Sequence, residues 1–181
     1  MNYDFLNDFV FSQKVDQELI AQYADRVPAS LIDIWTNYGL GTFLNGYLKI
    51  INPEEYVELL NDSYFRADVA VPIFATAFGD IITWEKQHFV TIVKYRYNRS
   101  DVMISGLEIF GMLLKDKSFK KAFFSLDAYE EAVKEYGELA YDECFGYAPL
   151  LAMGGIESVE NIKKVKMKEH IAVIIDMAGG V

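Results

Sequence analysis

The order of hydrophobic and polar positions along the chain predicts helices first, then strands, then helices again. In the clearest early helix, the apolar side chains fall at i, i+3, i+4 and i+7: Leu31, Ile34, Trp35 and Tyr38. Pro28 suits the first turn of this helix, and Gly39 can adopt the left-handed conformation that ends it. A shorter helix is expected before it, over residues 16–25.

A turn and a further helix are predicted next. Residues 43–51 alternate in polarity and contain Asn45-Gly46, a pair typical of β-hairpin turns. Helix resumes after Asn52, which is a good N-cap, because Pro53 fits the first helical position. The buried face of this helix is expected to consist of Tyr56, Leu59 and Leu60.

Residues 69–105 are rich in β-branched and aromatic side chains, which favour strands. Four segments of this kind follow one another: VAVPIFATAF, DIITWEK, HFVTIVKYRY and DVMIS. Turn sequences separate them at Gly79-Asp80, Lys86-Gln87 and Asn98-Arg99-Ser100. The sequence therefore predicts an antiparallel meander of three or four strands.

The chain returns to helical spacing after Gly106. Helices are expected over residues 107–115, over 117–124, after a capping Asp127, and over 168–178. Because the elements come in blocks, the predicted fold class is α+β, with N-terminal helices, a central antiparallel β meander and C-terminal helices packed on the sheet. No linker rich in Pro, Ser or Gly divides the chain, so residues 1–66, a helical region, and residues 67–181, an α+β region, are expected to form one compact unit.

Charge is distributed unevenly. The formal net charge is −10, and residues 127–161 hold nine acidic residues against one lysine. One interpretation is an ordinary solvated helix face; the other is an acidic docking surface for a basic protein. Under the second interpretation the candidate binding residues are Glu130, Glu131, Glu135, Glu138, Asp142 and Glu143.

The same acidity disfavours direct binding to nucleic acid, because phosphates and carboxylates repel each other. Cys144 is the single cysteine, so no internal disulfide can form, which fits a reducing compartment. Residues 1–11 lack the basic start and apolar stretch of a signal peptide, and no apolar run reaches the length of about 18 residues that spans a membrane. We therefore expect a cytoplasmic protein without a membrane partner.

The residues that carry chemistry form no recognisable catalytic or metal-binding motif. The two histidines, His88 and His170, stand in no known signature, and acidic neighbours oppose thiolate formation at Cys144. Neither CxxC nor HExxH is present. Gly39-Leu40-Gly41 follows a predicted helix rather than a strand, so it does not predict a dinucleotide site. We predict no catalytic residue, no cofactor and no metal.

Two stretches carry a resemblance to known families. Residues 27–56, with Trp35, Tyr38-Gly39, Asn45-Gly46-Tyr47 and Asn52-Pro53, are similar to the GAD-like domain. Residues 77–84, AFGDIITW, and residues 143–155, ECFGYAPLLAMGG, are similar to the domain that often follows it in immunity proteins against type VI secretion DNase toxins. The Trp-x-x-Tyr-Gly sequence is also similar to the wider SUKH class of immunity proteins.

The resemblance implies a protein that binds and silences a toxin made by the same cell or its kin. A nuclease toxin needs a basic groove for its substrate, and an acidic partner can cover that groove. Two alternatives stay open: a non-catalytic module that binds a small ligand or another protein, and an enzyme whose cleft the sequence does not reveal. The sequence is compatible with a monomer or a homodimer.

Overall fold

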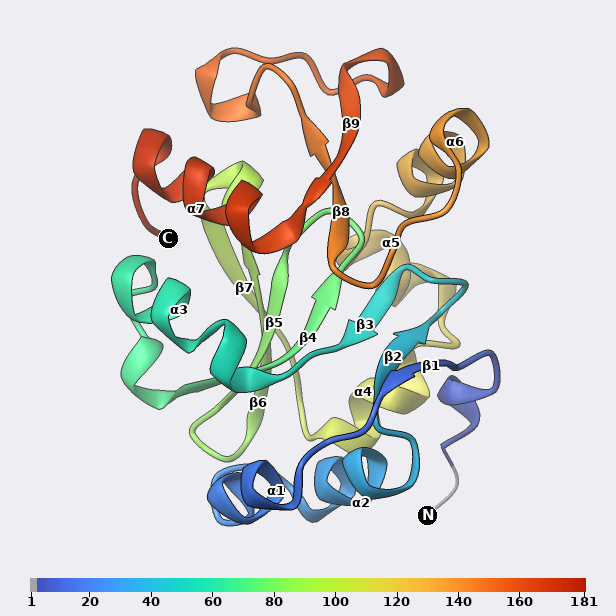
Figure 1. Ribbon diagram of the computed structural model, residues 1–181, viewed down its shortest axis with the longest axis vertical. Helices are drawn as coiled ribbons and strands as arrows, with labels where there is room; N and C mark the ends of the chain where they lie inside the picture. Colours follow the sequence, from blue (N-terminus) through green and yellow to red (C-terminus); the bar gives the residue numbers. More distant parts are fainter. Residues whose placement is uncertain (1–2) are drawn as a thin grey trace.

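The computed structural model describes residues 3–181, so the first two residues of the predicted N-terminal region lie outside the described part. Its centre is an antiparallel sheet whose strands follow the chain order (Figure 1). The strands are β1 (Val10–Gln13), β2 (Leu40–Phe43), β3 (Leu48–Ile50), β4 (Ala70–Thr76), β5 (Ile81–Glu85), β6 (Phe89–Lys94) and β7 (Arg99–Ser105). A separate antiparallel ribbon pairs β8 (Glu143–Tyr147) with β9 (Ile162–Lys166).

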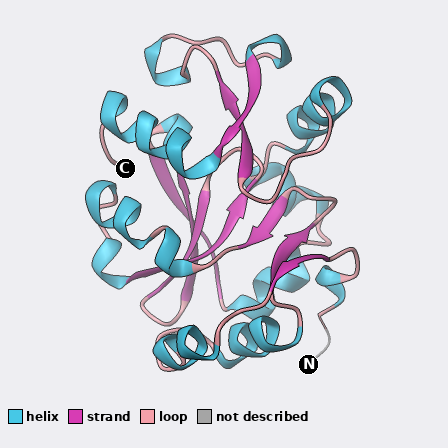
Figure 2. Cartoon of the chain, viewed as in Figure 1, coloured by secondary structure: helices cyan, strands magenta, loops and turns pink. Residues whose placement is uncertain are grey.

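Helices lie around both the sheet and the ribbon (Figure 2). They are α1 (Gln17–Tyr23), α2 (Ala29–Asn37), α3 (Val57–Ser63), α4 (Leu107–Leu113), α5 (Lys117–Phe123), α6 (Leu126–Tyr136) and α7 (Met167–Ala178). Short 3₁₀ turns connect several elements, among them Pro53–Glu55, where the Asn52 side chain accepts a hydrogen bond from the backbone N–H of Glu54. Within residues 3–181, no helix is long and apolar enough to cross a membrane.

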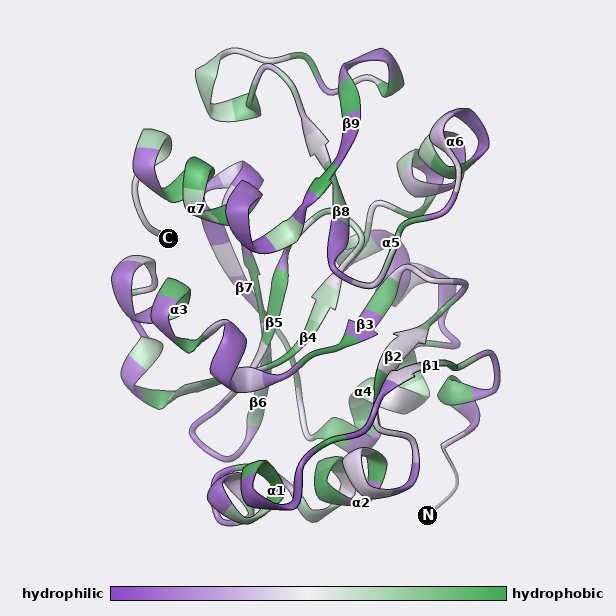
Figure 3. Cartoon of the chain, in the orientation of Figure 1, coloured by the Kyte–Doolittle hydropathy of each residue, from purple (hydrophilic) through white to green (hydrophobic). Residues whose placement is uncertain are grey.

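The central strands are buried on both faces, which explains their nearly continuous apolar sequences. Successive residues of a strand point to opposite faces, so Phe74 and Ile82 join one apolar cluster, whereas Ala75 and Ile81 join another. The first cluster includes side chains from α2, α4 and α6, and the second includes side chains from α3 and α7. Figure 3 shows the strands between these helices as mostly hydrophobic.

Extra residues interrupt the strand register at three places. Ser12 in β1 and Met103 in β7 have no partner of their own in the neighbouring strand, as in a β-bulge, and these two strands form the edges of the sheet. A third shift in β4 follows Pro72, whose missing N–H could not complete a regular ladder.

The structure confirms the predicted fold class: N-terminal helices, a central antiparallel meander, and C-terminal helices packed on the sheet. It also shows strands that the sequence pattern did not predict, since β1, β8 and β9 are short and carry no clear apolar alternation. The prediction that Asp127 caps α6 is wrong by two positions: the N-cap is Ser125, and Asp127 lies in the first turn.

Candidate functional site

Helix α6 presents an exposed acidic face beside the β8–β9 ribbon (Figure 1). Its inner face packs against the sheet through Tyr129 and Ala132, which are buried. Apolar residues at this spacing leave the intervening positions in solvent. Three predicted binding residues are exposed there, and Glu138 is exposed just beyond the end of the helix. We call the four the α6 acidic surface: Glu130, Glu131, Glu135 and Glu138.

The spacing of these carboxylates opposes helix stability. Glu131 and Glu135 lie at i and i+4, so their like charges are neighbours on the helix surface. Such a pair destabilises a helix by roughly 0.2–0.5 kcal/mol. Lys134, an exposed base, lies four residues after Glu130 on the same helix and offsets part of the repulsion. The surface thus keeps a concentration of negative charge that folding does not need.

The other two predicted residues have partners within the protein. Asp142 forms an ion pair with Lys166, with 2.6 Å between Oδ2 and Nζ, and this hydrogen bond lowers the pKa of the Asp142 carboxyl below its ordinary value. The Glu143 carboxylate accepts a hydrogen bond from the backbone N–H of Ala140 at 2.9 Å. The structure therefore separates the six candidates into the four carboxylates of the α6 acidic surface and two others that have partners within the protein: Asp142, which is exposed, and Glu143, which is half-buried.

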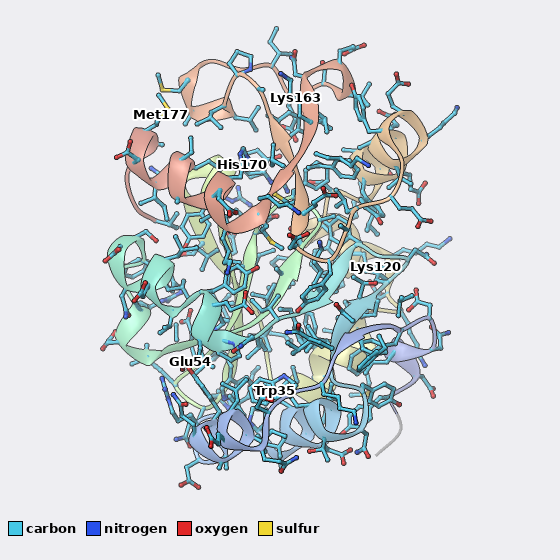
Figure 4. All side chains as sticks on the ribbon, viewed as in Figure 1. Trp35, Glu54, Lys120, Lys163, His170 and Met177 are labelled. Carbon is cyan, nitrogen blue, oxygen red and sulfur yellow. The ribbon has the colours of Figure 1, made fainter. Side chains whose placement is uncertain are left out.

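Lysines of β9 border this surface, a feature that the candidate set did not include. Lys164 donates from Nζ to the carbonyl of Glu138 at 3.2 Å, and Figure 4 shows Lys163 on the same strand. The sequence signal was the IKKVK run in a segment of net positive charge. Any partner that contacts the α6 acidic surface thus meets a basic border on the β9 side.

The hairpin formed by β2 and β3 holds the chain at both ends of α6. The Tyr47 hydroxyl accepts from the backbone N–H of Ser125 at 2.9 Å, and the Tyr129 hydroxyl donates to the Asn45 carbonyl at 2.8 Å. The turn after α6 is held by Lys49, whose ammonium donates to three backbone carbonyls: Ala140, Tyr141 and Glu143.

Lys49 is 1% exposed, and burial lowers its pKa to about 8. The same turn is also fixed by Tyr141, whose hydroxyl donates to the Ile50 carbonyl at 2.6 Å. The α6 acidic surface is therefore anchored to a part of the chain about 90 residues earlier.

The remaining chemical candidates, Cys144, His88 and His170, each have a structural explanation. Cys144 is fully buried, and that burial raises the pKa of its thiol to about 12. His88 shares a hydrogen bond with the Ser105 hydroxyl at 2.7 Å. His170 on α7 lies against Gly146 of β8, and burial lowers its pKa (Figure 4). Among residues 3–181, no group of three or more His, Cys, Asp or Glu side chains is placed to hold a metal ion.

An apolar cavity of about 270 Å³ opens between the N-terminal segment, α2 and α4. Phe5, Ile34 and Leu107 line it, and the ion pair of Asp4 with Lys115 borders it at 2.9 Å. Its described lining contains neither of the histidines nor the cysteine. The cavity shares no lining residue with the α6 acidic surface, so the two are separate sites.

The fold and this geometry define an α+β protein that displays a charged helix on a sheet buried on both faces. A family model for the GAD-like domain matches residues 3–96, more than half of the chain, and the chain belongs to this family. The model described as T6SS immunity protein Tdi1, C-terminal, matches residues 105–178. This second match includes the α6 acidic surface and the β8–β9 ribbon.

A solved structure supports the fold. The chain is similar to the crystal structure of Atu4351 from Agrobacterium tumefaciens, with a TM-score of 0.77 and 20% sequence identity over 95% of this chain and 87% of that one. At this identity the likeness shows the arrangement of elements alone. No curated protein matches the chain.

Proposed function

We propose that this protein neutralises a cognate nuclease toxin of a type VI secretion system by binding it, without catalysis, through the α6 acidic surface. The observation that carries the proposal is the exposed group Glu130, Glu131, Glu135 and Glu138 inside the region that matches an immunity-protein family. Like charges on one helix face cost folding energy, so a role in binding accounts for their presence better than stability does.

The charge supplies a physical reason for both speed and specificity. A nuclease groove that binds phosphates is basic, and a negatively charged partner is attracted to it before contact. Electrostatic steering raises association rates by about 10 to 10³ at low salt. An immunity protein benefits because it must reach the toxin before the toxin reaches nucleic acid. The proposal places this encounter in the cytoplasm.

The test begins with the protein encoded beside this gene. That protein, made with its active site inactivated, should co-purify with the full chain. The combined substitutions Glu131→Lys, Glu135→Lys and Glu138→Lys should then slow association by about tenfold or more at low salt, with a smaller loss at high salt, because ions screen exposed charges.

A matched control changes the same amount of charge elsewhere. Glu18, Glu58 and Asp62 are exposed on α1 and α3, so replacing all three with Lys alters the net charge equally. This control should leave most of the association rate intact. Equal losses in the two triple variants would show that overall charge matters and the α6 acidic surface does not. Unchanged affinity in the first variant would refute the proposed contact.

A further inference from the structure

The two regions that the family models match meet at the β2–β3 hairpin. Asn45, Tyr47, Lys49 and Ile50 belong to the GAD-like region, and each makes a hydrogen bond to α6 or to its flanking residues. The hairpin tip is well defined by its sequence. Leu44, Asn45 and Gly46 all have positive φ, and the Asp8 carboxylate accepts from the backbone N–H groups of Leu44 and Asn45.

Lys49 is the least replaceable member of this contact. A buried ammonium loses its hydration, and it is tolerated only where hydrogen bonds replace the lost water. The three N–H bonds of Lys49 end on the carbonyls of Ala140 and Tyr141 in the turn after α6 and of Glu143 at the start of β8. Those carbonyls lie beyond the helix; the Ala140 carbonyl also accepts from the backbone N–H of Glu143 at 3.1 Å.

The groups around Lys49 favour its charged form. Asp142 comes from the turn, Glu143 begins β8, and the Tyr141 ring lies 6.0 Å from Nζ. An uncharged amine would have one donor fewer for the three carbonyls. The ammonium thus holds two consecutive features in place: the turn that follows α6 and the start of β8.

We propose that Lys49, within the β2–β3 hairpin, is a positioning residue that sets the orientation of the α6 acidic surface for toxin binding without touching the toxin. The inference rests on the proposed function of that surface. It gives the GAD-like region a role in binding, because its β2–β3 hairpin would hold rigid the α6 acidic surface, which lies in residues 105–178. A surface ordered before contact binds more tightly, because less conformational entropy is lost on association.

The central experiment replaces Lys49→Met, which keeps most of the side-chain volume and removes the ammonium. Hydrogen exchange, followed by mass spectrometry on the full chain, should become about tenfold faster or more for the amides of residues 126–143, because local opening becomes easier. The inactivated toxin encoded beside this gene should bind the variant about tenfold more weakly or worse.

The matched control is Lys94→Met. Lys94 lies on β6 and is 5% exposed, so the chemical change is the same, but no hydrogen bond joins it to α6 among residues 3–181. Exchange over residues 126–143 and toxin affinity should change far less than in Lys49→Met, because Lys94 reaches α6 only through the charges of Asp80 and Arg96. If Lys49→Met fails to fold, Tyr141→Phe tests the same contact more gently, since it removes the bond to the Ile50 carbonyl and keeps the ring.

The outcomes separate this inference from the proposed function. Unchanged exchange over residues 126–143 in both Lys49→Met and Tyr141→Phe would overturn the positioning role. Faster exchange with unchanged affinity would do the same, provided that charge reversal of α6 still weakens binding. If charge reversal of α6 has no effect, the proposed surface itself is wrong, and the positioning role fails with it.

Discussion

The buried ion pair between Arg96 and Asp80 offers the sharpest test of how the fold is held together. Their side chains are 4% and 1% exposed, and the guanidinium contacts both carboxylate oxygens at 3.1 and 3.0 Å. The Arg96 guanidinium also donates to the Ser125 hydroxyl at 3.1 Å and lies 4.5 Å from the centre of the Phe78 ring. Arg96 thus joins the β4–β5 turn to the start of α6.

Replacing Arg96→Met should destabilise the protein strongly, because it leaves the Asp80 carboxylate buried without its cation. Breaking one half of a buried pair costs about 3–5 kcal/mol. A protein of this length loses roughly 2–4 °C of melting temperature per kcal/mol, so the expected decrease is on the order of 6–20 °C. Urea unfolding measures the free energy directly, with Trp35 and Trp84 as buried fluorescent reporters.

The control is an exposed pair of the same chemistry. Arg99 and Asp101 contact each other at 3.0 Å, but their side chains are 58% and 37% exposed, so Arg99→Met should cost at most about 1 kcal/mol. Adding Asp80→Asn to Arg96→Met should recover part of the loss, because no unpaired charge then remains. If Arg96→Met costs no more than Arg99→Met, the reasoning about burial is refuted.

Three further predictions concern α7, β8 and their contact. Burial lowers the pKa of His170 below its ordinary value of about 6.5. As the pH falls through about 6.5, His170 therefore takes up a proton in the unfolded chain before it does so in the native protein. Stability should therefore fall as pH drops from 7 to 5, and His170→Gln should remove that part of the decrease in urea titrations. In Gly146→Ala, the new Cβ would lie 2.5 Å from the His170 ring, so the free energy of unfolding should fall by about 1–3 kcal/mol. Adding His170→Ala should recover part of that loss, and a purely additive result would contradict the clash. Cys144 has a buried thiol whose pKa is raised to about 12, so a colourimetric thiol reagent should react only after denaturant is added; rapid reaction of the native protein would contradict the burial.

Local sequence patterns were sufficient for the elements whose signals are local. Asn45-Gly46 marked the hairpin turn because positive φ suits these residues, and Leu31, Ile34 and Trp35 marked α2 because they form one buried face. Val10–Gln13 was not predicted as a strand because all four residues are exposed, so the edge strand has no apolar alternation. Ser125 was missed as the N-cap because Ser and Asp are both favoured N-caps, so residue type alone does not separate Ser125 from Asp127.

The candidate site was predictable only in part. The carboxylates of residues 130–138 cluster in sequence, so a charge count found them. The partners of Asp142 and Glu143 are set by the pairing of β8 with β9 and by the turn after α6, which no local pattern shows. Lys49 had no signal at all, since its contacts lie about 90 residues away and a lysine in an amphipathic segment normally points to water.

The extra residues in β1 and β7 affect how copies of the protein can associate when its concentration is high. Both rims of the sheet end in a strand whose regular hydrogen-bonding repeat is broken by Ser12 or Met103. A foreign strand seeking to extend the sheet would find no even row of donors and acceptors on either side. We therefore expect copies of the protein to show little tendency to pair edge to edge when they are concentrated.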